Sequence, residues 1–288
     1  IICSFMFDLE NLTKSDFEKV KSWGLDLDPF AAIKDFSFLK CEQRWQNEEQ
    51  ILAHNEYVRK RLDYIKNKDF DNYYRNAFKP IEKIKWEYLK LRKAWYITPL
   101  GWENIAQNGG IVADMGMGDG DVVQRLIEFC IEYWKKNKLS PVKIHIIGID
   151  LNFSRVENAK KLVHSNDENI TFEFHQGDFV GDVLTYSPKY FDYSLITGVF
   201  EILDDEQFNS AIKEIARVTK TGIYIEDLFE TFPGGFPRDY LGKSLFDLGF
   251  ITKQRHVIFS EPFNINELQD PRKLWPNFLD QNIWAEVE

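Results

Sequence analysis

Residues 111–126 read IVADMGMGDGDVVQRL, and this stretch decides the fold. A short apolar run ends at Asp114 and passes into Gly116, Gly118 and Gly120, after which helix-forming residues begin. Glycines allow a tight turn and let a ligand approach the backbone, and a helix start offers unpaired N–H groups. The pattern predicts a strand, a ligand-binding loop and a helix. Taken alone, such a loop also fits a plain turn or a nicotinamide site.

Strand-like and helix-like segments alternate after this loop. We expect seven strands, at 111–114, 143–150, 170–175, 191–197, 222–226, 251–259 and 283–287, and helices at 122–134, 154–164, 207–219 and 240–248. This alternation predicts a parallel sheet with helices on both faces. The last two strands have no helix between them, so they predict an antiparallel hairpin. The predicted fold is therefore α/β, with a doubly wound, seven-stranded, mostly parallel sheet and an antiparallel last hairpin.

The first part of the chain has a different character, because helix-forming residues dominate and strand-like runs are few. We expect a helical N-terminal lid or substrate region over residues 1–105 and the doubly wound domain over residues 106–288. Within the first region, residues 59–93 contain 12 Lys and Arg against five Asp and Glu. Such a segment is usually a set of solvated helix faces, but it could also dock an acidic partner, RNA or an anionic substrate.

The whole chain of 288 residues is acidic, with 36 Lys and Arg against 46 Asp and Glu and a net charge of −10. Its mean field repels polyanions, which disfavours general binding of nucleic acid or anionic membranes. A run of about 20 apolar residues, which a membrane span needs, is missing from the sequence. The three cysteines, Cys3, Cys41 and Cys130, lack the spacing of a zinc site. We therefore expect no metal, reduced thiols and a cytoplasmic location.

Acidic residues follow the next two predicted strands. Asp150 ends the second strand, and Asp178 follows the third in the sequence HQGDF. In doubly wound folds, an acidic residue at the end of the second strand accepts hydrogen bonds from ribose hydroxyls. Asp119 and Asp121, beside the glycine loop, would repel a pyrophosphate. This argues against NAD or FAD and favours a ligand that carries positive charge, such as S-adenosylmethionine.

The segments resemble, in order, the motifs of class I S-adenosylmethionine-dependent methyltransferases. IVADMGMGDG (111–120) resembles the first motif, GID (148–150) the second, QGDF (176–179) the third and FDYSLITGVFEIL (191–203) the fourth. IARVTKTGIYIE (215–226) and SLFDLGFITKQRHVIF (244–259) resemble the passages into the fifth and sixth strands. The resemblance covers roughly residues 110–287. The chain departs from the pattern at Met117, where Cys or Ser is commoner, and at Ile202, where many small-molecule enzymes carry His.

The resemblance implies an S-adenosylmethionine cofactor at this loop. Gly116 and Gly118 would give backbone access to its methionine end, and Asp114 would order the loop or bind the ammonium group. The implied cofactor-binding residues are Asp114, Gly116, Gly118, Asp119, Asp150, Leu151, Asp178, Phe179 and Thr197.

The ribose and adenine contacts are implied in the same way. Asp150 would take the ribose diol, and Leu151 would pack on adenine. Asp178 would accept from the adenine amine, while Phe179 would donate its backbone N–H or stack on the ring. The simpler roles are a helix cap for Asp150, a turn residue for Asp178 and a helix-dipole partner for Asp119.

The substrate is less defined than the cofactor. The fourth strand ends in Thr197, Gly198, Val199 and Phe200, which is not the motif used to methylate planar amines of bases or glutamine. Glu226 or Asp227 could orient an acceptor hydroxyl or amine, and we predict them as catalytic residues; their simpler role is to cap a helix or to pair with Arg238. The predicted substrate-binding residues are Tyr73, Tyr96, Glu201 and Phe232.

We expect methyl transfer to an O, N or S atom of a small molecule under an aromatic helical lid. One alternative is an RNA or protein methyltransferase that docks through residues 59–93. The other is a cofactor-binding subunit with little activity of its own. The expected partner is a small-molecule substrate, without nucleic acid or membrane, and a homodimer stays open.

Overall fold

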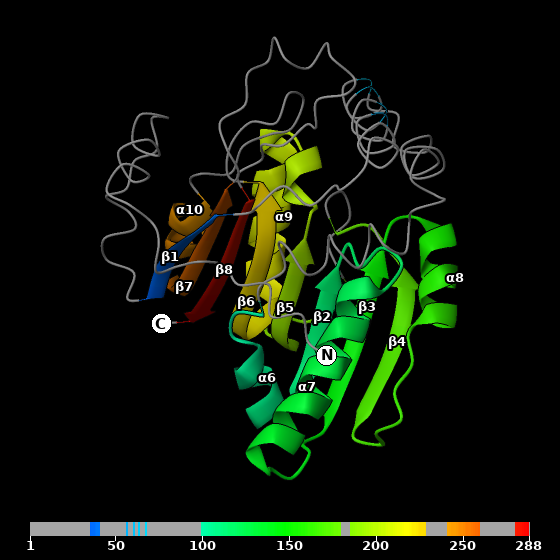
Figure 1. The fold of residues 1–288 in the computed structure, drawn as a ribbon. Coiled ribbons are helices and arrows are strands. Elements are labelled where there is room, and N and C mark those ends of the chain that lie inside the picture. Colours follow the sequence, from blue (N-terminus) through cyan, green and yellow to red (C-terminus); the bar gives the residue numbers. More distant parts are fainter. Residues whose placement is uncertain are drawn as a thin grey trace.

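The protein is described here from a computed structural model, which covers residues 35–40, 99–179, 185–228, 241–259 and 280–287, together with positions 56, 60, 63 and 67. Its centre is an eight-stranded sheet with the strand order β1-β7-β8-β6-β5-β2-β3-β4 (Figure 1). The strands are β1 (Asp35–Lys40), β2 (Gly110–Met115), β3 (Ile144–Asp150), β4 (Ile170–Gln176), β5 (Phe191–Thr197), β6 (Thr219–Leu228), β7 (Phe250–Phe259) and β8 (Asp280–Val287).

The seven predicted strands and their arrangement are confirmed. β4, β3, β2, β5 and β6 pair in parallel, whereas β8 runs antiparallel to both β6 and β7. Runs of β-branched and apolar residues, such as IHIIGID in β3, explain why the central strands could be predicted, since parallel strands are buried on both faces.

The eighth strand, β1, was not predicted from the sequence. It pairs in parallel with β7, and Asp35 lies opposite Gln254. A strand at the edge of a sheet presents a row of unpaired backbone groups, and an extended segment can cover them whatever its side chains are. Most of residues 1–98 lies outside the described residues, so the predicted helical region and the division at residue 105 stay predictions.

Helices cover both faces of the sheet (Figure 1). The described helices are α6 (Trp102–Asn108), α7 (Asp121–Asn137), α8 (Phe153–Leu162), the 3₁₀ turn η3 (Phe200–Ile202), α9 (Asp205–Val218) and α10 (Leu241–Asp247). The first three contribute to one buried cluster and the last two to another. The chain therefore forms three layers, with the sheet in the middle.

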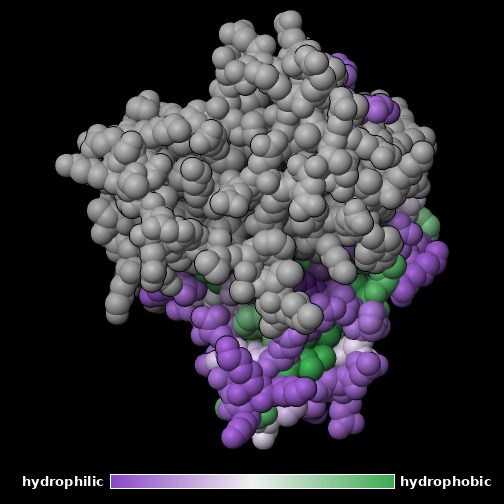
Figure 2. All heavy atoms as spheres, in the orientation of Figure 1, coloured by the Kyte–Doolittle hydropathy of each residue, from purple (hydrophilic) through white to green (hydrophobic). Residues whose placement is uncertain are grey.

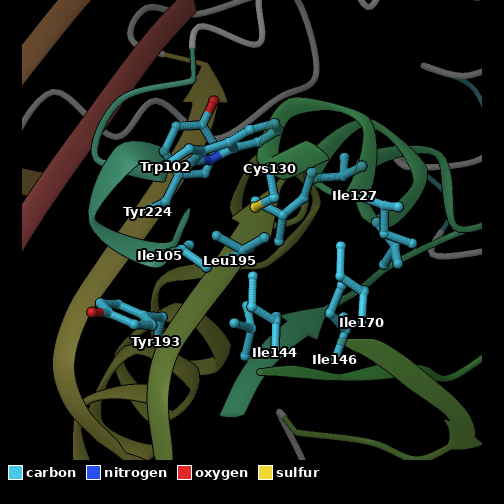
Figure 3. Close-up of a cluster of buried hydrophobic side chains, with 14 of the residues drawn as sticks. Trp102, Ile105, Ile127, Cys130, Ile144, Ile146, Ile170, Tyr193, Leu195 and Tyr224 are labelled. Carbon is cyan, nitrogen blue, oxygen red and sulfur yellow. The ribbon is translucent and has the colours of Figure 1, made fainter. Parts of the chain in front are cut away.

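The cluster beneath α6 and α7 is rich in aromatic residues. Trp102 is fully buried and makes edge contacts with Phe129 and Tyr224, whose ring centroids lie 5.6 and 5.8 Å away. Cys130 lies in the same cluster, where burial raises the pKa of its thiol to about 12 (Figure 3). This packing ties α6 and α7 to the sheet on the side that carries the glycine loop.

The described surface is mostly hydrophilic in the view of Figure 2. Among the described helices, none combines the length and the apolar composition that crossing a bilayer would require. The exposed large apolar residues include Leu151, which follows β3, and Phe153, which begins α8.

Candidate active site

The glycine loop lies between β2 and α7 and has the left-handed backbone that glycine permits. Gly116, Gly118 and Gly120 have φ values of 80°, 60° and 80°. The N–H of Gly116 donates to the carbonyl of Ile149 at 2.8 Å, which fastens the loop to β3. A Cβ on Gly116 would overlap Val199, and one on Gly118 would overlap the guanidinium of Arg155. Glycine is therefore required at these positions, because the backbone is left-handed and neighbouring side chains leave no room for a Cβ.

Met117 explains one departure from the family pattern. Its side chain is buried, and its sulfur occupies the space that a Cβ on Gly148 would need. Gly148 pairs with Asp114 across β3 and β2. The side chain of Met117 fits in the loop because Gly148, on the neighbouring strand, has no side chain.

Asp150 accepts a hydrogen bond from the backbone of the glycine loop. Its carboxylate is 4% exposed, and its oxygens accept from the N–H groups of Gly118 and Asn152, each at 2.8 Å. A carboxylate offers about four acceptor positions, so positions remain for the two ribose hydroxyls. The cap of α8 is Asn152, whose side chain accepts from the N–H of Arg155 at 3.2 Å. The simpler role considered for Asp150, that of a helix cap, is therefore taken by another residue.

Asp114 lies in the buried part of β2, between Ala113 and Met115, and is fully enclosed. In the part of the chain that the structure describes, neither of its oxygens has a hydrogen-bond partner. Burial raises the pKa of its carboxyl to about 8; Asp150 and Asp121 add to this effect, and Arg155 opposes it. A buried polar group without a partner costs free energy. A ligand with a positively charged donor, such as the ammonium of S-adenosylmethionine, would supply the missing partner, so the residues present fit this cofactor.

Asp119 lies between the loop and α8. Its Oδ1 accepts from the side chain of Asn158 at 3.2 Å and lies 3.9 Å from Nε of Arg155. The sequence did not single out Arg155. The signal that could have found it is its place in the first turn of the helix after Asp150, because that turn lies beside the loop at the carboxyl ends of the strands.

The predicted adenine contacts have different surroundings. Leu151 is 54% exposed, so its side chain is accessible for packing on a ring. Phe179 is 6% exposed and belongs to the core cluster that includes residues of α9 and α10. Its stacking on adenine or donation from its backbone N–H stays a prediction, as does the role of Asp178 after β4. Phe153, which begins α8 and is 59% exposed, was not predicted.

The ends of β5 and β6 bring two carboxylates together. Thr197 pairs with Glu226 across the strands, and Gly198 follows with a φ of 60°. Oε1 of Glu201 and Oε2 of Glu226 each lie 3.9 Å from the position that a Cβ on Gly198 would take. Their side chains are 5% and 4% exposed. The acidic pair therefore borders the end of β5, next to the glycine loop after β2. The cofactor role of Thr197 stays a prediction.

Asp227 has a structural role that the sequence did not predict. It is fully buried, and its Oδ2 accepts from the backbone N–H of Phe200 at 2.7 Å. Successive residues of a strand point to opposite faces, so Asp227 and Glu226 leave the sheet on different sides. Asp227 thereby anchors η3, the turn that carries Glu201. Its predicted catalytic role stays a prediction.

The remaining predicted contacts lie outside the described residues. These are Tyr73, Tyr96 and Phe232, together with Arg238 and almost all of the basic segment 59–93. The described Lys60 pairs with Glu56 at 3.0 Å on a helical stretch. Among the residues that the structure describes, no three His, Cys, Asp or Glu side chains are grouped so that they could hold a metal ion.

The comparisons with known proteins agree with this geometry. Residues 112–222 match the family model of a methyltransferase domain. No curated protein sequence matches the chain.

Several solved structures are similar in fold at low sequence identity. One is the magnesium protoporphyrin IX methyltransferase ChlM from Synechocystis PCC 6803 with bound SAM, at 14% identity and a TM-score of 0.49, covering 86% of this chain and all of that one. Another is a SAM-dependent methyltransferase from Archaeoglobus fulgidus, at 17% identity and a TM-score of 0.44, covering 69% of this chain and 94% of that one. A third, from Methanosarcina mazei, has 17% identity and a TM-score of 0.46, covering 67% of this chain and 98% of that one.

The assignment rests on the family match and on the site. The loop glycines have the left-handed backbone described above, Asp150 ends β3, and neither oxygen of Asp114 has a hydrogen-bond partner among the described residues. Residues 112–222 therefore form a methyltransferase domain, and the residues of its glycine loop fit S-adenosylmethionine as the cofactor.

Proposed function

We propose that the enzyme methylates an O, N or S atom of a small molecule under a cover formed by part of residues 1–105. The observation that carries this proposal is the buried carboxylate pair Glu201 and Glu226 at Gly198. β5, which ends at this pair, lies next to β2, which leads into the glycine loop. Because the acceptor must lie beside the sulfonium, we place it at the end of β5.

The net charge of the chain favours a small acceptor over a nucleic acid. The chain carries a net charge of −10, and its mean field repels phosphates. The low exposure of Glu201 and Glu226 favours a substrate small enough to enter a covered position. An acceptor with a hydroxyl or amine hydrogen could donate to either carboxylate.

Methyl transfer mainly requires that the acceptor atom is aligned with the methyl group and the sulfur of the cofactor. A lone pair of the acceptor atom attacks the methyl carbon, the carbon–sulfur bond breaks, and its electron pair stays on sulfur in S-adenosylhomocysteine. An acceptor proton, where one is present, passes to a carboxylate or to solvent. Holding the two reactants in line lowers the barrier by removing the entropy cost of their encounter. Excluding water protects the reactive sulfonium.

The test has two stages. The purified protein is titrated calorimetrically with S-adenosylmethionine, S-adenosylhomocysteine and NAD, and we expect micromolar binding of the first two only. It is then supplied with methyl-labelled cofactor and fractionated metabolites, RNA or protein. We expect label in the small-molecule fraction. Label in RNA, with binding that weakens steeply as salt rises, would replace this proposal with the polymer-docking alternative. Tight cofactor binding without any transfer would favour the cofactor-binding subunit.

A matched pair of variants tests the carboxylates. Glu226→Gln replaces a buried carboxyl group of β6 by an amide and should lower turnover while cofactor binding persists. Glu132→Gln, an exposed position of α7, is the control and should leave both unchanged. Equal turnover in the wild type and in Glu226→Gln would contradict the placement of the acceptor. A cytoplasmic location and a homodimer stay predictions from the sequence.

A further inference from the structure

One cation of α7 is shielded from solvent without a full set of partners. Arg125 lies in the second turn of this helix and is partly buried, and its Nη1 has no hydrogen-bond partner in the part of the chain that the structure describes. Glu128, one turn further along, is exposed and accepts from the side chain of Gln124 at 3.0 Å. Burial lowers the pKa of the Arg125 guanidinium, because the charged form is costly away from water. An anion beside Nη1 would offset this cost.

A second donor without an acceptor lies next to this turn. Trp102, the first residue of α6, is fully buried, and its Nε1 has no hydrogen-bond partner among the described residues. Its ring makes an edge contact with Phe129 of α7, with the centroids 5.6 Å apart. Phe129 and Arg125 are four residues apart, so they are neighbours on one stripe of the helix, and Arg125 is one turn closer to the glycine loop. Two N–H donors that lack acceptors therefore lie where α6 meets α7.

This contact lies beside the proposed position of the acceptor. The Trp102 ring also packs on Tyr224, with the centroids 5.8 Å apart (Figure 3). Tyr224 and Glu226 are two residues apart on β6, so they share a face of the sheet and lie about 7 Å apart along the strand. The Tyr224 hydroxyl donates to Oδ1 of Asn282 at 2.6 Å, and Asn282 lies opposite Glu226 across β8 and β6. The two donors are therefore on the β6 side of the glycine loop, whereas the ribose is expected on the β3 side.

We propose that Arg125 and Trp102 form an anion-binding subsite that holds a carboxylate or phosphate group of the acceptor molecule. The inference rests on the proposed function, the methylation of a small molecule at the end of β5. A guanidinium presents paired N–H donors that match two oxygens of a carboxylate or phosphate, and the indole N–H can donate to the same group. With its anionic group at Arg125 and its accepting atom near Glu226, a small substrate would be oriented at both ends.

The first experiment measures thermal unfolding of the S-adenosylhomocysteine complex in chloride, acetate or phosphate at equal ionic strength. It compares the wild type, Arg125→Met, Arg125→Lys and the control Lys136→Met, which removes an exposed cation from the last turn of the same helix. An anion that binds the folded state raises its melting temperature. Acetate or phosphate should raise the melting temperature of the wild type and of Lys136→Met by about 2–4 °C more than that of Arg125→Met.

The second experiment follows the methyl label into metabolites that anion exchange has divided into a retained, anionic fraction and an unretained fraction. We expect the label in the retained fraction. With the labelled acceptor, Arg125→Met should raise KM about 10- to 100-fold, and Arg125→Lys should raise it less. Trp102→Phe, which loses the N–H and keeps an aromatic ring, should raise KM about two- to tenfold. The calorimetric affinity for S-adenosylhomocysteine should stay unchanged in Arg125→Met, because the subsite belongs to the acceptor.

Three results would overturn the inference. They are equal effects of acetate and phosphate on the wild type and Arg125→Met, label confined to the unretained fraction, and a weakened affinity of Arg125→Met for S-adenosylhomocysteine, which would assign the guanidinium to the carboxylate of the cofactor. Label in the unretained fraction would leave the proposed function standing, whereas its absence from every small-molecule fraction would refute the proposed function and the subsite with it. If Arg125→Met does not fold, Arg125→Gln takes its place in both experiments.

Discussion

Replacing Asp114 by Asn should make the protein more stable at neutral pH, by an amount that grows with pH. The carboxyl has an ordinary value of 3.8, and burial raises its pKa to about 8 in the folded state. Between these values the folded protein keeps a proton that the unfolded chain has lost. Stability therefore falls as the pH rises through this window, and a neutral Asn escapes the loss.

The magnitude follows from one proton. A difference of one bound proton changes the free energy of unfolding by about 1.4 kcal/mol per pH unit. The gap between Asp114→Asn and the wild type should therefore widen by about 1.4 kcal/mol from pH 6 to pH 7, and level off above pH 8. Any cost of the Asn amide in this enclosure is independent of pH and shifts the whole curve equally.

The assay is urea unfolding followed by tryptophan fluorescence at pH 5, 6, 7 and 8. The midpoints and slopes give the free energies of unfolding, and equal slopes show that the exposed surface is unchanged. Glu132→Gln, on the exposed side of α7, is the control, and its difference from the wild type should stay small throughout. A gap between Asp114→Asn and the wild type that is constant from pH 5 to pH 8 would refute the reasoning, because Asp114 would then be ionised across the whole range.

Variants at three further positions test the loop and the anchor of η3. Asp150→Ala should weaken S-adenosylmethionine binding by about 1–3 kcal/mol, and unchanged calorimetric affinity in a folded variant would contradict the ribose assignment. Gly118→Ala should abolish measurable cofactor binding, because the position has a φ of 60° and the Arg155 guanidinium fills the space of the new Cβ; full affinity would mean that the loop tolerates a side chain. Asp227→Ala should lower the free energy of unfolding by about 1–3 kcal/mol, because it leaves the buried N–H of Phe200 without its acceptor, whereas Asp227→Asn keeps an acceptor oxygen and should lose less; equal losses in urea unfolding would argue against the anchor.

Most strands of the parallel sheet could be predicted from local sequence. Segments such as KIHIIGID, at 143–150, are apolar over the length of a strand and are flanked on both sides by turn-forming residues. β1 could not be found in this way, because its place depends on backbone groups that β7 leaves open at the edge. The burial of Phe179 could not be predicted for a related reason. The residue follows a strand end, and only the packed structure shows that its ring belongs to the core.

The sequence by itself determined the order of strands and helices, the glycine loop and the acidic residue after the second strand, because these depend on periodicity and on backbone freedom that a few adjacent residues express. Only the tertiary structure decided how distant side chains combine. It places Arg155 against Gly118, brings Glu201 and Glu226 to Gly198, and encloses Asp114. Contact between residues far apart in the chain, and the desolvation that shifts the pKa of a carboxyl, arise only when the elements pack together.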